Sequence, residues 1–345
     1  MTDREPIGKG ADSETSWRGD VTHAAAPASA FVIATRNRPE ELLGTVRSLA
    51  GQSVLPAELC IVDSSEAATI RAEIQELCSS VGLHLDYFHP APRGLTVQRN
   101  IGIERTKGDP VFLIDDDVVL DPHCHAAVLE EYAKWGPELG GVRGVPTKPA
   151  KPPLISRIWR KLFGMGGWWP ENTGRMRSGF FVEGISASAS PRKVEYFNGW
   201  FMSYRRSVFD LERFDEKLSG YAYKEDIDFS YRVVKRGFVL IQTPRARVTH
   251  LKSGTSRLPA RDLQRMNLAN QFYLHRKNMP QTLRYKASLW WALLGLFVLS
   301  MGKSVQQRDT GFAMGLIAGA WEQARGRGLI DPATERDQTR RGTNV

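Results

Sequence analysis

Four short apolar segments, separated by stretches with helical periodicity, constrain the fold of this chain more than any other feature. Three are continuous apolar runs and one alternates apolar with polar residues, so all four are predicted to be β-strands. The predicted strands are residues 30–34, 59–62, 83–88 and 111–114. The predicted helices between them are residues 39–49, 70–78 and 100–106. Because a continuous apolar strand must be covered on both faces, the pattern predicts an α/β fold with a mostly parallel sheet between two helical layers.

Polar residues follow three of the predicted strands at the point where each strand ends. The three clusters are Thr35-Arg36-Asn37, Asp63-Ser64-Ser65 and Asp115-Asp116-Asp117. In sheets of this kind, ligands bind beyond the carboxyl ends of the strands. One polar strand end would mean little, but three of them predict a shared ligand site.

The acidic triplet is the strongest chemical signal in the sequence. Three adjacent carboxylates repel one another unless a cation lies among them. Because alternate residues of an extended chain point the same way, Asp115 and Asp117 are predicted to face one ligand and Asp116 another. Carboxylate oxygens suit Mg²⁺ or Mn²⁺, especially where a diphosphate supplies further oxygens. The alternative interpretation is an acidic turn exposed to solvent.

Two further candidate groups lie in the C-terminal half. Glu225 and Asp226 begin a helix predicted at residues 226–236, where acidic residues are ordinary complements of the helix dipole. Beside a bound metal and diphosphate, a carboxylate there could instead deprotonate an incoming hydroxyl group. His250 follows the last predicted strand, residues 238–241. A lone histidine is more often structural, although imidazole is an acceptable Mn²⁺ ligand alongside carboxylates.

Composition and missing motifs exclude several classes of protein. With 345 residues, 41% hydrophobic and 25% charged, the chain can bury a core, so it is not disordered, collagenous or a multi-span membrane protein. There is no Walker A sequence, no GxGxxG after a strand, no HExxH and no paired CxxC. Three cysteines without metal-ligand spacing favour a reducing compartment. Carboxylate chemistry is what remains.

The net charge of +9 lies entirely in the C-terminal part, since residues 250–345 contain 15 Lys/Arg and 6 Asp/Glu. Within it, residues 287–301 are almost wholly apolar, between Lys286 and Lys303. As a helix this run would span about 22 Å, whereas bilayer hydrocarbon is about 30 Å thick. The run is therefore expected to lie in the membrane interface more readily than to span the bilayer.

A second apolar run, residues 311–321, carries Gly311, Gly315 and Gly319 at a spacing that allows close helix contact. The two runs are expected to form a shallow helical hairpin. Together with the basic charge, this favours an anionic membrane surface over nucleic acid as partner, because aromatic and basic residues do not interleave here as in a strand-binding groove. The alternative is a buried amphipathic pair that caps the catalytic domain.

Taken in order across residues 29–250, these motifs resemble those of the family-2 glycosyltransferases, which have a GT-A fold. The matching segments are Phe31-Val32-Ile33-Ala34-Thr35-Arg36-Asn37-Arg38-Pro39-Glu40, Cys60-Ile61-Val62-Asp63-Ser64-Ser65, Gly94-Leu95-Thr96-Val97-Gln98-Arg99-Asn100-Ile101-Gly102, Phe112-Leu113-Ile114-Asp115-Asp116-Asp117, Asn198-Gly199-Trp200-Phe201-Met202-Ser203-Tyr204-Arg205-Arg206 and Glu225-Asp226. Each segment is weak alone, but together they are specific for the family and unspecific for the sugar.

The resemblance implies a role for each candidate residue. The nucleotide base and ribose would be contacted by Thr35, Arg36 and Asp63. The remaining donor-binding residues would be Arg99, Asn100, Asp115 and Asp116, with the arginine and asparagine near the diphosphate or ribose. The ligands of Mn²⁺ or Mg²⁺ would be Asp117 and His250. The catalytic base would be Asp226, with Glu225 as its alternative. The acceptor side would include Gly199 and Trp200.

The function that this resemblance implies is transfer of a hexose or deoxyhexose, with inversion, from a UDP-, dTDP- or GDP-linked donor. The acceptor would be a hydroxyl group of a lipid-linked or cell-surface glycan, at the cytoplasmic face of the membrane. The QxxRW motif of processive synthases is absent, so a single transfer is expected. Two rivals stay open: a nucleotidyltransferase, although the turn after the first strand lacks the glycines of a triphosphate loop, and a non-catalytic nucleotide- or membrane-binding module.

Five segments are expected along the chain. They are a flexible leader (1–28), a nucleotide-sugar-binding half (29–120), an acceptor-binding half with the catalytic base (121–255), a helical membrane-associated region (256–325) and a basic flexible tail (326–345). Residues 140–195, rich in Gly, Pro, Lys and Arg, are expected to be long and partly mobile. Their tryptophans, Trp159, Trp168 and Trp169, could belong to a lid, an acceptor surface or ordinary packing.

Overall fold

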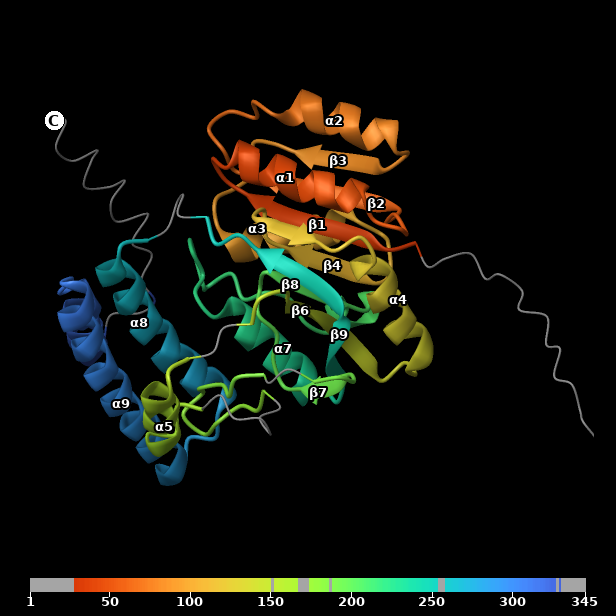
Figure 1. Cartoon of the computed structure of the whole chain (residues 1–345). Coiled ribbons are helices and arrows are strands. Elements are labelled where there is room, and N and C mark those ends of the chain that lie inside the picture. The colour runs from red at the N-terminus through yellow and green to blue at the C-terminus, as the bar shows by residue number, and fades with distance from the viewer. Residues whose placement is uncertain are drawn as a thin grey trace, which may run out of the picture.

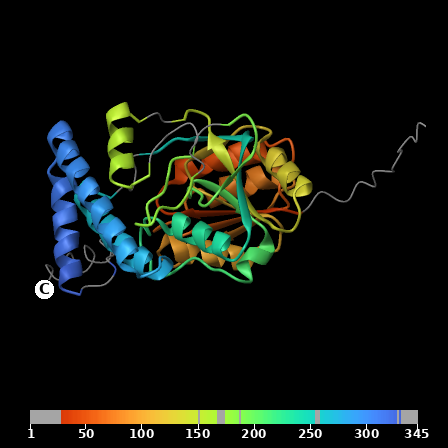
Figure 2. The same cartoon turned by 90° about the horizontal axis from the view of Figure 1, so that it is seen from below.

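The computed structural model describes residues 28–149, 152–166, 174–185, 188–253, 258–326 and 329. The predicted leader and tail therefore lie almost wholly outside the described residues, as do Trp168 and Trp169. A central sheet carries helices on both faces, and a group of C-terminal helices stands beside it (Figures 1 and 2). The predicted fold class, α/β with a mostly parallel sheet and a C-terminal helical region, is confirmed.

The strands are β1 (Ala30–Thr35), β2 (Glu58–Asp63), β3 (His84–Phe88), β4 (Val111–Ile114), β5 (Val118–Leu120), β6 (Leu139–Pro146), β7 (Arg192–Val194), β8 (Phe201–Tyr204) and β9 (Val239–His250). The helices are α1 (Pro39–Ala50), α2 (Arg71–Ser80), α3 (Leu95–Arg105), α4 (Cys124–Lys134), α5 (Leu154–Leu162), α6 (Arg206–Phe209), α7 (Glu225–Lys235), α8 (Ala260–Asn278), α9 (Leu283–Gln307) and α10 (Gly311–Ala324).

The strand order brings the predicted polar clusters to one edge. The sheet runs β3-β2-β1-β4-β8-β6-β9-β5, with β7 paired to β9. The first four strands are parallel, so their carboxyl ends lie together, and Thr35 is in register with Asp63. The next strand, β8, is antiparallel to β4 and begins just after Trp200, which brings that residue to the same edge.

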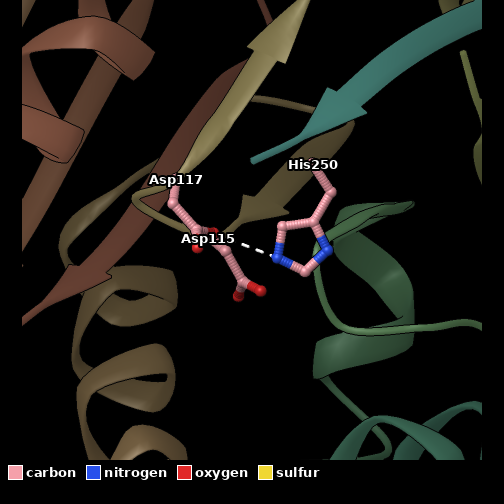
Figure 3. A group of neighbouring side chains, drawn as sticks. All are labelled: Asp115, Asp117 and His250. Carbon is pink, nitrogen blue, oxygen red and sulfur yellow. Dashed lines mark ion pairs between the residues drawn. The ribbon is translucent and has the colours of Figure 1, made fainter. Parts of the chain in front are cut away.

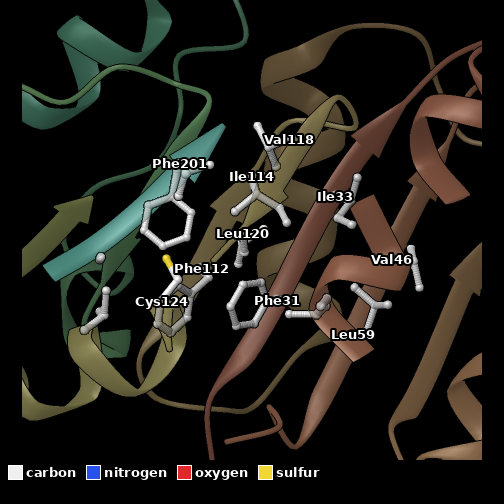
Figure 4. Packing of buried hydrophobic residues seen from close by; sticks show 14 of the residues in the cluster. Phe31, Ile33, Val46, Leu59, Phe112, Ile114, Val118, Leu120, Cys124 and Phe201 are labelled. Atoms are coloured by element: carbon white, nitrogen blue, oxygen red, sulfur yellow. The ribbon is translucent and has the colours of Figure 1, made fainter. Parts of the chain in front are cut away.

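The core lies on both faces of this sheet because β1, β2 and β4 are continuous apolar runs. Phe31 stacks on Phe112 of the neighbouring strand with ring centroids 4.3 Å apart, on the face that Figure 4 shows. Val32 and Leu113 point to the other face, where they pack with residues of α3 and α7. A sheet buried on both faces gives its strand ends rigid positions, and these ends are where the polar clusters begin.

The segment 140–195 contains more regular structure than its composition indicates. It includes α5, β7 and most of β6. Glycines in β6 permit unusually close strands, because a Cβ on Gly141 would lie 2.8 Å from the Ser203 carbonyl oxygen and one on Gly144 would lie 2.5 Å from that of Ala246. The glycine content therefore reflects tight packing here, where the sequence interpretation expected mobility.

The two C-terminal apolar runs form α9 and α10, which pack against each other as the expected hairpin. The glycines at fourfold spacing face α8, however. A Cβ on Gly315 would lie 2.3 Å from the Arg261 carbonyl oxygen, and one on Gly319 would lie 3.0 Å from that of Arg265. The close contact that the spacing predicts thus exists, and its partner is α8.

Candidate active site

Three side chains from separate elements form a candidate metal group at the carboxyl edge of the sheet. Asp115 and Asp117 follow β4, and His250 ends β9 (Figure 3). One ligand atom of each residue lies within 4.8 Å of the others, and His250 Nε2 is 3.1 Å from Asp117 Oδ1. The predicted acidic site and the predicted histidine are therefore neighbours in space, although more than 130 residues separate Asp117 from His250.

The chemistry of this group fits a divalent ion. Two carboxylates and one imidazole are ligands that Mn²⁺ accepts. Burial alone would raise the pKa of Asp117, but the hydrogen bond and charge of His250, the charge of Arg38 and the backbone N–H of Ser253 lower it on balance. Asp117 is therefore ionised and ready to bind a cation. Asp115 is more exposed, with 31% of its side chain accessible, so the group opens on one side toward a ligand.

Asp116 is not a member of this group and has partners of its own, although it and Asp117 lie in a turn and not in the extended chain that the prediction assumed. It accepts hydrogen bonds from Thr35 Oγ1 (2.8 Å) and from Arg38 Nη1 (2.5 Å). Its burial raises its pKa to about 7, even though Arg38 and Thr35 act in the opposite direction. Arg38 also reaches Asp117, at 3.4 Å, and thus links the buried carboxylate to the candidate metal ligand. In this arrangement Asp116 anchors Arg38 and Thr35.

The predicted base- and ribose-contacting residues lie at the ends of β1 and β2. Asp63 is buried and accepts hydrogen bonds from Tyr87 Oη (2.7 Å) and from the Ser65 backbone N–H (2.8 Å). Gln98 donates to the backbone carbonyls of both Thr35 and Val62, and so ties the two strand ends together. Arg36 follows Thr35, and its Nε is buried without a hydrogen-bond partner among the described residues. These residues thus form one wall beside the carboxylate group.

Arg99 connects the two acidic clusters. It is 2% exposed, forms an ion pair with Glu225, and donates to Asp115 Oδ1 (3.2 Å) and to the Gly199 carbonyl (3.0 Å). Burial alone would lower its pKa, but the charges of Glu225, Asp115 and Asp226 raise it. Asn100, its neighbour, bonds instead to Phe214 and to Glu216, so its amide supports the loop before α7.

Glu225 and Asp226 begin α7 and differ in their surroundings. Glu225 is committed to Arg99, whereas Asp226 Oδ2 accepts a hydrogen bond from the Gly199 backbone N–H (2.7 Å) and Oδ1 accepts one from Ile227 (2.8 Å). Burial raises the pKa of both carboxyls, and that of Glu225 reaches about 8 because the charge of Asp226 adds to the effect. Asp226 is the less enclosed of the two and is held in place by backbone alone.

Gly199 and Trp200 join the metal group to the base. A Cβ on Gly199 would lie 3.1 Å from both Arg99 Nη2 and Glu225 Oε1, so glycine is the residue that fits there. The Trp200 ring stacks near His250, with centroids 6.2 Å apart, and its carbonyl accepts from the Asp115 backbone N–H. Most of the predicted site residues thus share one network. Asn100 bonds to Phe214 and Glu216, Asp63 bonds to Tyr87 and Ser65, and Arg36 Nε has no partner among the described residues.

Arg38 and Arg143 contact this network and were not among the predicted site residues. Arg38 has a recognisable signal, because it is a cation in the turn after the first strand and three adjacent carboxylates need compensation. Arg143 gave no signal, since it lies in the glycine-rich β6. It is 3% exposed and its guanidinium lies over the Trp200 ring, 5.2 Å from the centroid.

Comparisons with known proteins agree with this geometry. The family model for glycosyl transferase family 2 matches residues 30–210, more than half of the chain. The N-acetylglucosaminyl-diphospho-decaprenol L-rhamnosyltransferase of Mycobacterium tuberculosis (strain ATCC 25618 / H37Rv) is 26% identical over 266 residues, which cover 72% of this chain and 81% of the relative. The protein of the same name from strain CDC 1551 / Oshkosh matches equally.

Two solved structures show the same fold. The mannosyltransferase PcManGT from Pyrobaculum calidifontis, in complex with GDP-Man and Mn²⁺, has a TM-score of 0.54 at 15% identity over 87% of each chain. GalNAc-T7 with UDP, GalNAc and Mn²⁺ has a TM-score of 0.53 at 16% identity, over 82% of this chain and 58% of that one. The motifs, the sheet and the family match agree, and the chain belongs to glycosyl transferase family 2, with a GT-A fold.

Proposed function

We propose that this glycosyltransferase moves a sugar, with inversion, from a nucleoside diphosphate sugar to a hydroxyl group of a lipid-linked acceptor. The observation that carries the proposal is the network in which Arg99 and Gly199 join a metal-binding group to the half-buried carboxylate of Asp226. A cation site and a base held at a defined separation are what a single displacement at a sugar carbon requires.

The residues divide the work between donor and acceptor. Thr35, Arg36 and Asp63 line the wall that would receive the nucleoside. Asp115, Asp117 and His250 would hold Mn²⁺ or Mg²⁺, which when bound neutralises the charge of the diphosphate. Arg99 fixes the position of Asp115 relative to Glu225 of α7, because it pairs with both carboxylates.

The base works from the other end of the network. The Gly199 backbone N–H aims Asp226 Oδ2 at the acceptor side, where it takes the proton of the hydroxyl group that attacks the anomeric carbon. Attack from the face opposite to the departing diphosphate inverts the anomeric centre. In this assignment Asp226 is the base, and Glu225 keeps Arg99 in place.

A lipid-linked acceptor is supported by two observations. The curated relative is named for a diphospho-decaprenol acceptor. The surface of α5, α9 and α10 exposes many large apolar side chains. They are Leu154, Ile155, Ile158, Leu162, Leu283, Trp290, Trp291, Leu294, Phe297, Val298, Met301, Val305, Met314, Ile317 and Trp321. An exposed apolar surface of this extent is typical of a membrane-binding face.

Among the described residues, α9 is the one helix with the length and apolar composition to cross a bilayer, with mean hydropathy 1.4 over its most apolar stretch. Its neighbours argue for an interfacial position. Trp159 of α5 donates to the Gly295 carbonyl, and α10 packs on both α9 and α8. The same helices are joined to the catalytic sheet, because Asn278 of α8 bonds to the buried Asp228 of α7. We therefore place α9 along the cytoplasmic membrane surface, with the catalytic sheet beside it.

Charge substitutions on the apolar surface test this membrane contact. Ile155→Glu in α5 and Trp290→Glu in α9 change residues that are 75% and 63% exposed, so the fold should tolerate both. Each should reduce the fraction of protein that floats with anionic liposomes, because a carboxylate in the interface is unfavourable. Leu211→Glu, at a 53% exposed residue after α6, is the matched control and should float normally. Unchanged flotation of both test variants would place the membrane contact elsewhere.

The raised pKa values of the α7 carboxyls predict a pH dependence. A base must be ionised to accept a proton, and burial raises the pKa of Asp226, so transfer should already fall at a pH above the range in which an ordinary carboxyl group takes up a proton. Glu225→Gln removes a neighbouring negative charge and should move the acid limb of kcat to lower pH. Rate profiles of both proteins test this, and an acid limb that does not move would mean that another group controls it.

The donor is identified by a thermal-shift screen of UDP-, dTDP- and GDP-sugars with and without Mn²⁺. A ligand that binds only the folded state raises the melting temperature by mass action, so the right donor should stand out in the presence of the metal. Slow hydrolysis of that donor without acceptor would separate the enzyme from a non-catalytic nucleotide-binding module. Formation of a nucleotidyl product instead of a glycoside would favour the nucleotidyltransferase rival.

A further inference from the structure

Three basic side chains near Asp226 have only neutral hydrogen-bond partners among the residues that the structure describes. Arg143 donates to Asn198 Oδ1 (2.8 Å) and to the Gly144 carbonyl (3.1 Å). Arg160 donates to the Met165 carbonyl (3.3 Å), and its Nε is buried without any partner. Lys224 donates to Gln271 Oε1. None of the three forms an ion pair within the described part of the chain.

This neutral setting differs from that of the other cations in the site. Arg38 and Arg99 are each paired with two carboxylates. Arg143 is just as buried as Arg99, yet its burial lowers its pKa to about 10, and burial with the charge of Arg160 lowers that of Lys224 to about 7. Arg143 is buried, and Arg160 and Lys224 are half-buried. Removing unpaired cations from water is unfavourable, so their presence here points to an anion that is part of the working complex.

The cations lie near the base: Arg143 bonds to Asn198, the residue before Gly199, and Lys224 is two residues before Asp226. Lys224 interacts electrostatically with Arg160 and Asp226, and Arg143 interacts with Asp226. The buried Tyr196 lies within reach of both arginines. In the part of the chain that the structure describes, none of the three interacts with Asp115 or Asp117. The cations therefore border Asp226, and Arg143 also lies over the Trp200 ring, which stacks near His250.

We propose that Arg143, Arg160 and Lys224 bind a diphosphate carried by the acceptor, on the anomeric carbon of the sugar whose hydroxyl group is activated by Asp226. The assignment rests on the proposed function, because it takes the donor's diphosphate to lie at Asp115, Asp117 and His250. One sugar ring then separates the attacking oxygen from the anionic group, which matches cations that lie near the base without contacting its carboxylate.

The position of Arg160 links this subsite to the membrane face. Arg160 lies in α5, whose exposed residues Leu154, Ile155 and Ile158 belong to the apolar surface. The helix is held against α9 by ring contact between Phe163, which follows α5, and Trp291. The order in space is therefore base, cations and apolar surface. An acceptor built as sugar, diphosphate and lipid has the same order.

Direct binding tests the subsite without catalysis. Farnesyl diphosphate, titrated calorimetrically in EDTA to exclude the metal group, should bind the full-length protein. Arg160→Gln should weaken this binding about tenfold or more, whereas Lys161→Gln, an equal loss of charge at an exposed residue of the same helix, should leave it unchanged. Absence of binding to the unmodified protein, or equal binding by Arg160→Gln, would overturn the proposal.

Kinetics separate recognition of the diphosphate from a structural role of Arg160. With N-acetylglucosaminyl-diphospho-farnesol and a farnesyl N-acetylglucosaminide as acceptors, the unmodified enzyme should prefer the diphosphate form in kcat/KM. Arg160→Gln should raise KM for that form about tenfold and reduce the preference, with donor KM unchanged. Equal loss on both acceptors would make Arg160 merely structural and would refute the proposal.

Two further measurements distinguish the possible sources of failure. If Arg160 bound a phospholipid headgroup instead, Arg160→Gln but not Lys161→Gln would lose flotation with anionic liposomes, which would overturn the acceptor assignment. Donor binding is measured separately, as the thermal shift with nucleoside diphosphate sugars and Mn²⁺. Loss of that shift refutes the proposed function, whereas a normal shift without farnesyl diphosphate binding refutes only the acceptor subsite.

Discussion

Asp226→Asn should lower the rate of sugar transfer by about 10²- to 10⁴-fold while leaving donor affinity unchanged. The asparagine side chain has the same shape and can still accept the hydrogen bond from the Gly199 backbone N–H, so the local geometry survives. What is lost is the capacity to take a proton from the attacking hydroxyl group. Single-turnover transfer and calorimetric titration of the donor would measure the two effects separately.

Asp228→Asn is the informative comparison because it makes the same change two residues further along α7. Asp228 is fully buried and binds Asn278, Lys277 and Arg232, so its role is to hold α7 against α8. Its substitution should lower the melting temperature. If Asp226→Asn instead lowered stability and kept turnover, the base would have to be another group, and Glu225 would be the first candidate.

Asp117→Ala should abolish the metal-dependent part of nucleoside diphosphate binding. The substitution removes a carboxylate that lies within 4.8 Å of Asp115 and His250 ligand atoms, and leaves one carboxylate and one imidazole. A site with so few protein ligands should hold Mn²⁺ poorly even when a diphosphate is present. Mn²⁺ binding, followed by electron paramagnetic resonance with and without nucleotide, would report the loss directly.

The control for this variant is Asp86→Ala. Asp86 lies on β3, away from the metal group, and its carboxylate pairs with Arg105 of α3. It should keep both Mn²⁺ and nucleotide binding. Unchanged metal-dependent binding by Asp117→Ala would mean that Asp115, Asp117 and His250 do not form the cation site. In that case the acidic triplet would serve only to anchor Arg38 through Asp116.

Local patterns were sufficient to predict the first four strands of the sheet and the edge at which their polar ends meet. Continuous apolar runs are readable as buried strands because burial on both faces depends on the run itself, and their polar ends fall at one edge wherever the strands are parallel. The acidic triplet is split as predicted, with Asp116 bonded to Thr35 and its neighbours beside His250, but Asp116 and Asp117 lie in a turn, so the alternation of an extended chain is not the reason. These features depend on residues adjacent in sequence.

Features made by distant residues were not readable. The Arg99–Glu225 pair joins residues 126 positions apart, and the glycines of α10 pack against α8 rather than α9. Asn100, adjacent to Arg99 in the motif, points to Phe214 instead. In α3, a step of one residue turns the side chain by about 100°, so only the packing of the helix decides which neighbour enters the site.

The sequence alone thus determined the fold class, the family and the carboxylates available for catalysis, because each depends on short-range periodicity or on motifs of consecutive residues. Only the tertiary structure decided that α5 carries an exposed apolar face, that Arg143 is buried over Trp200, and that Arg160 and Lys224 come close enough to interact electrostatically. Whether a cation is buried, and whether a carboxylate lies beside it, depends on side chains from several elements. No single segment of the chain encodes these properties.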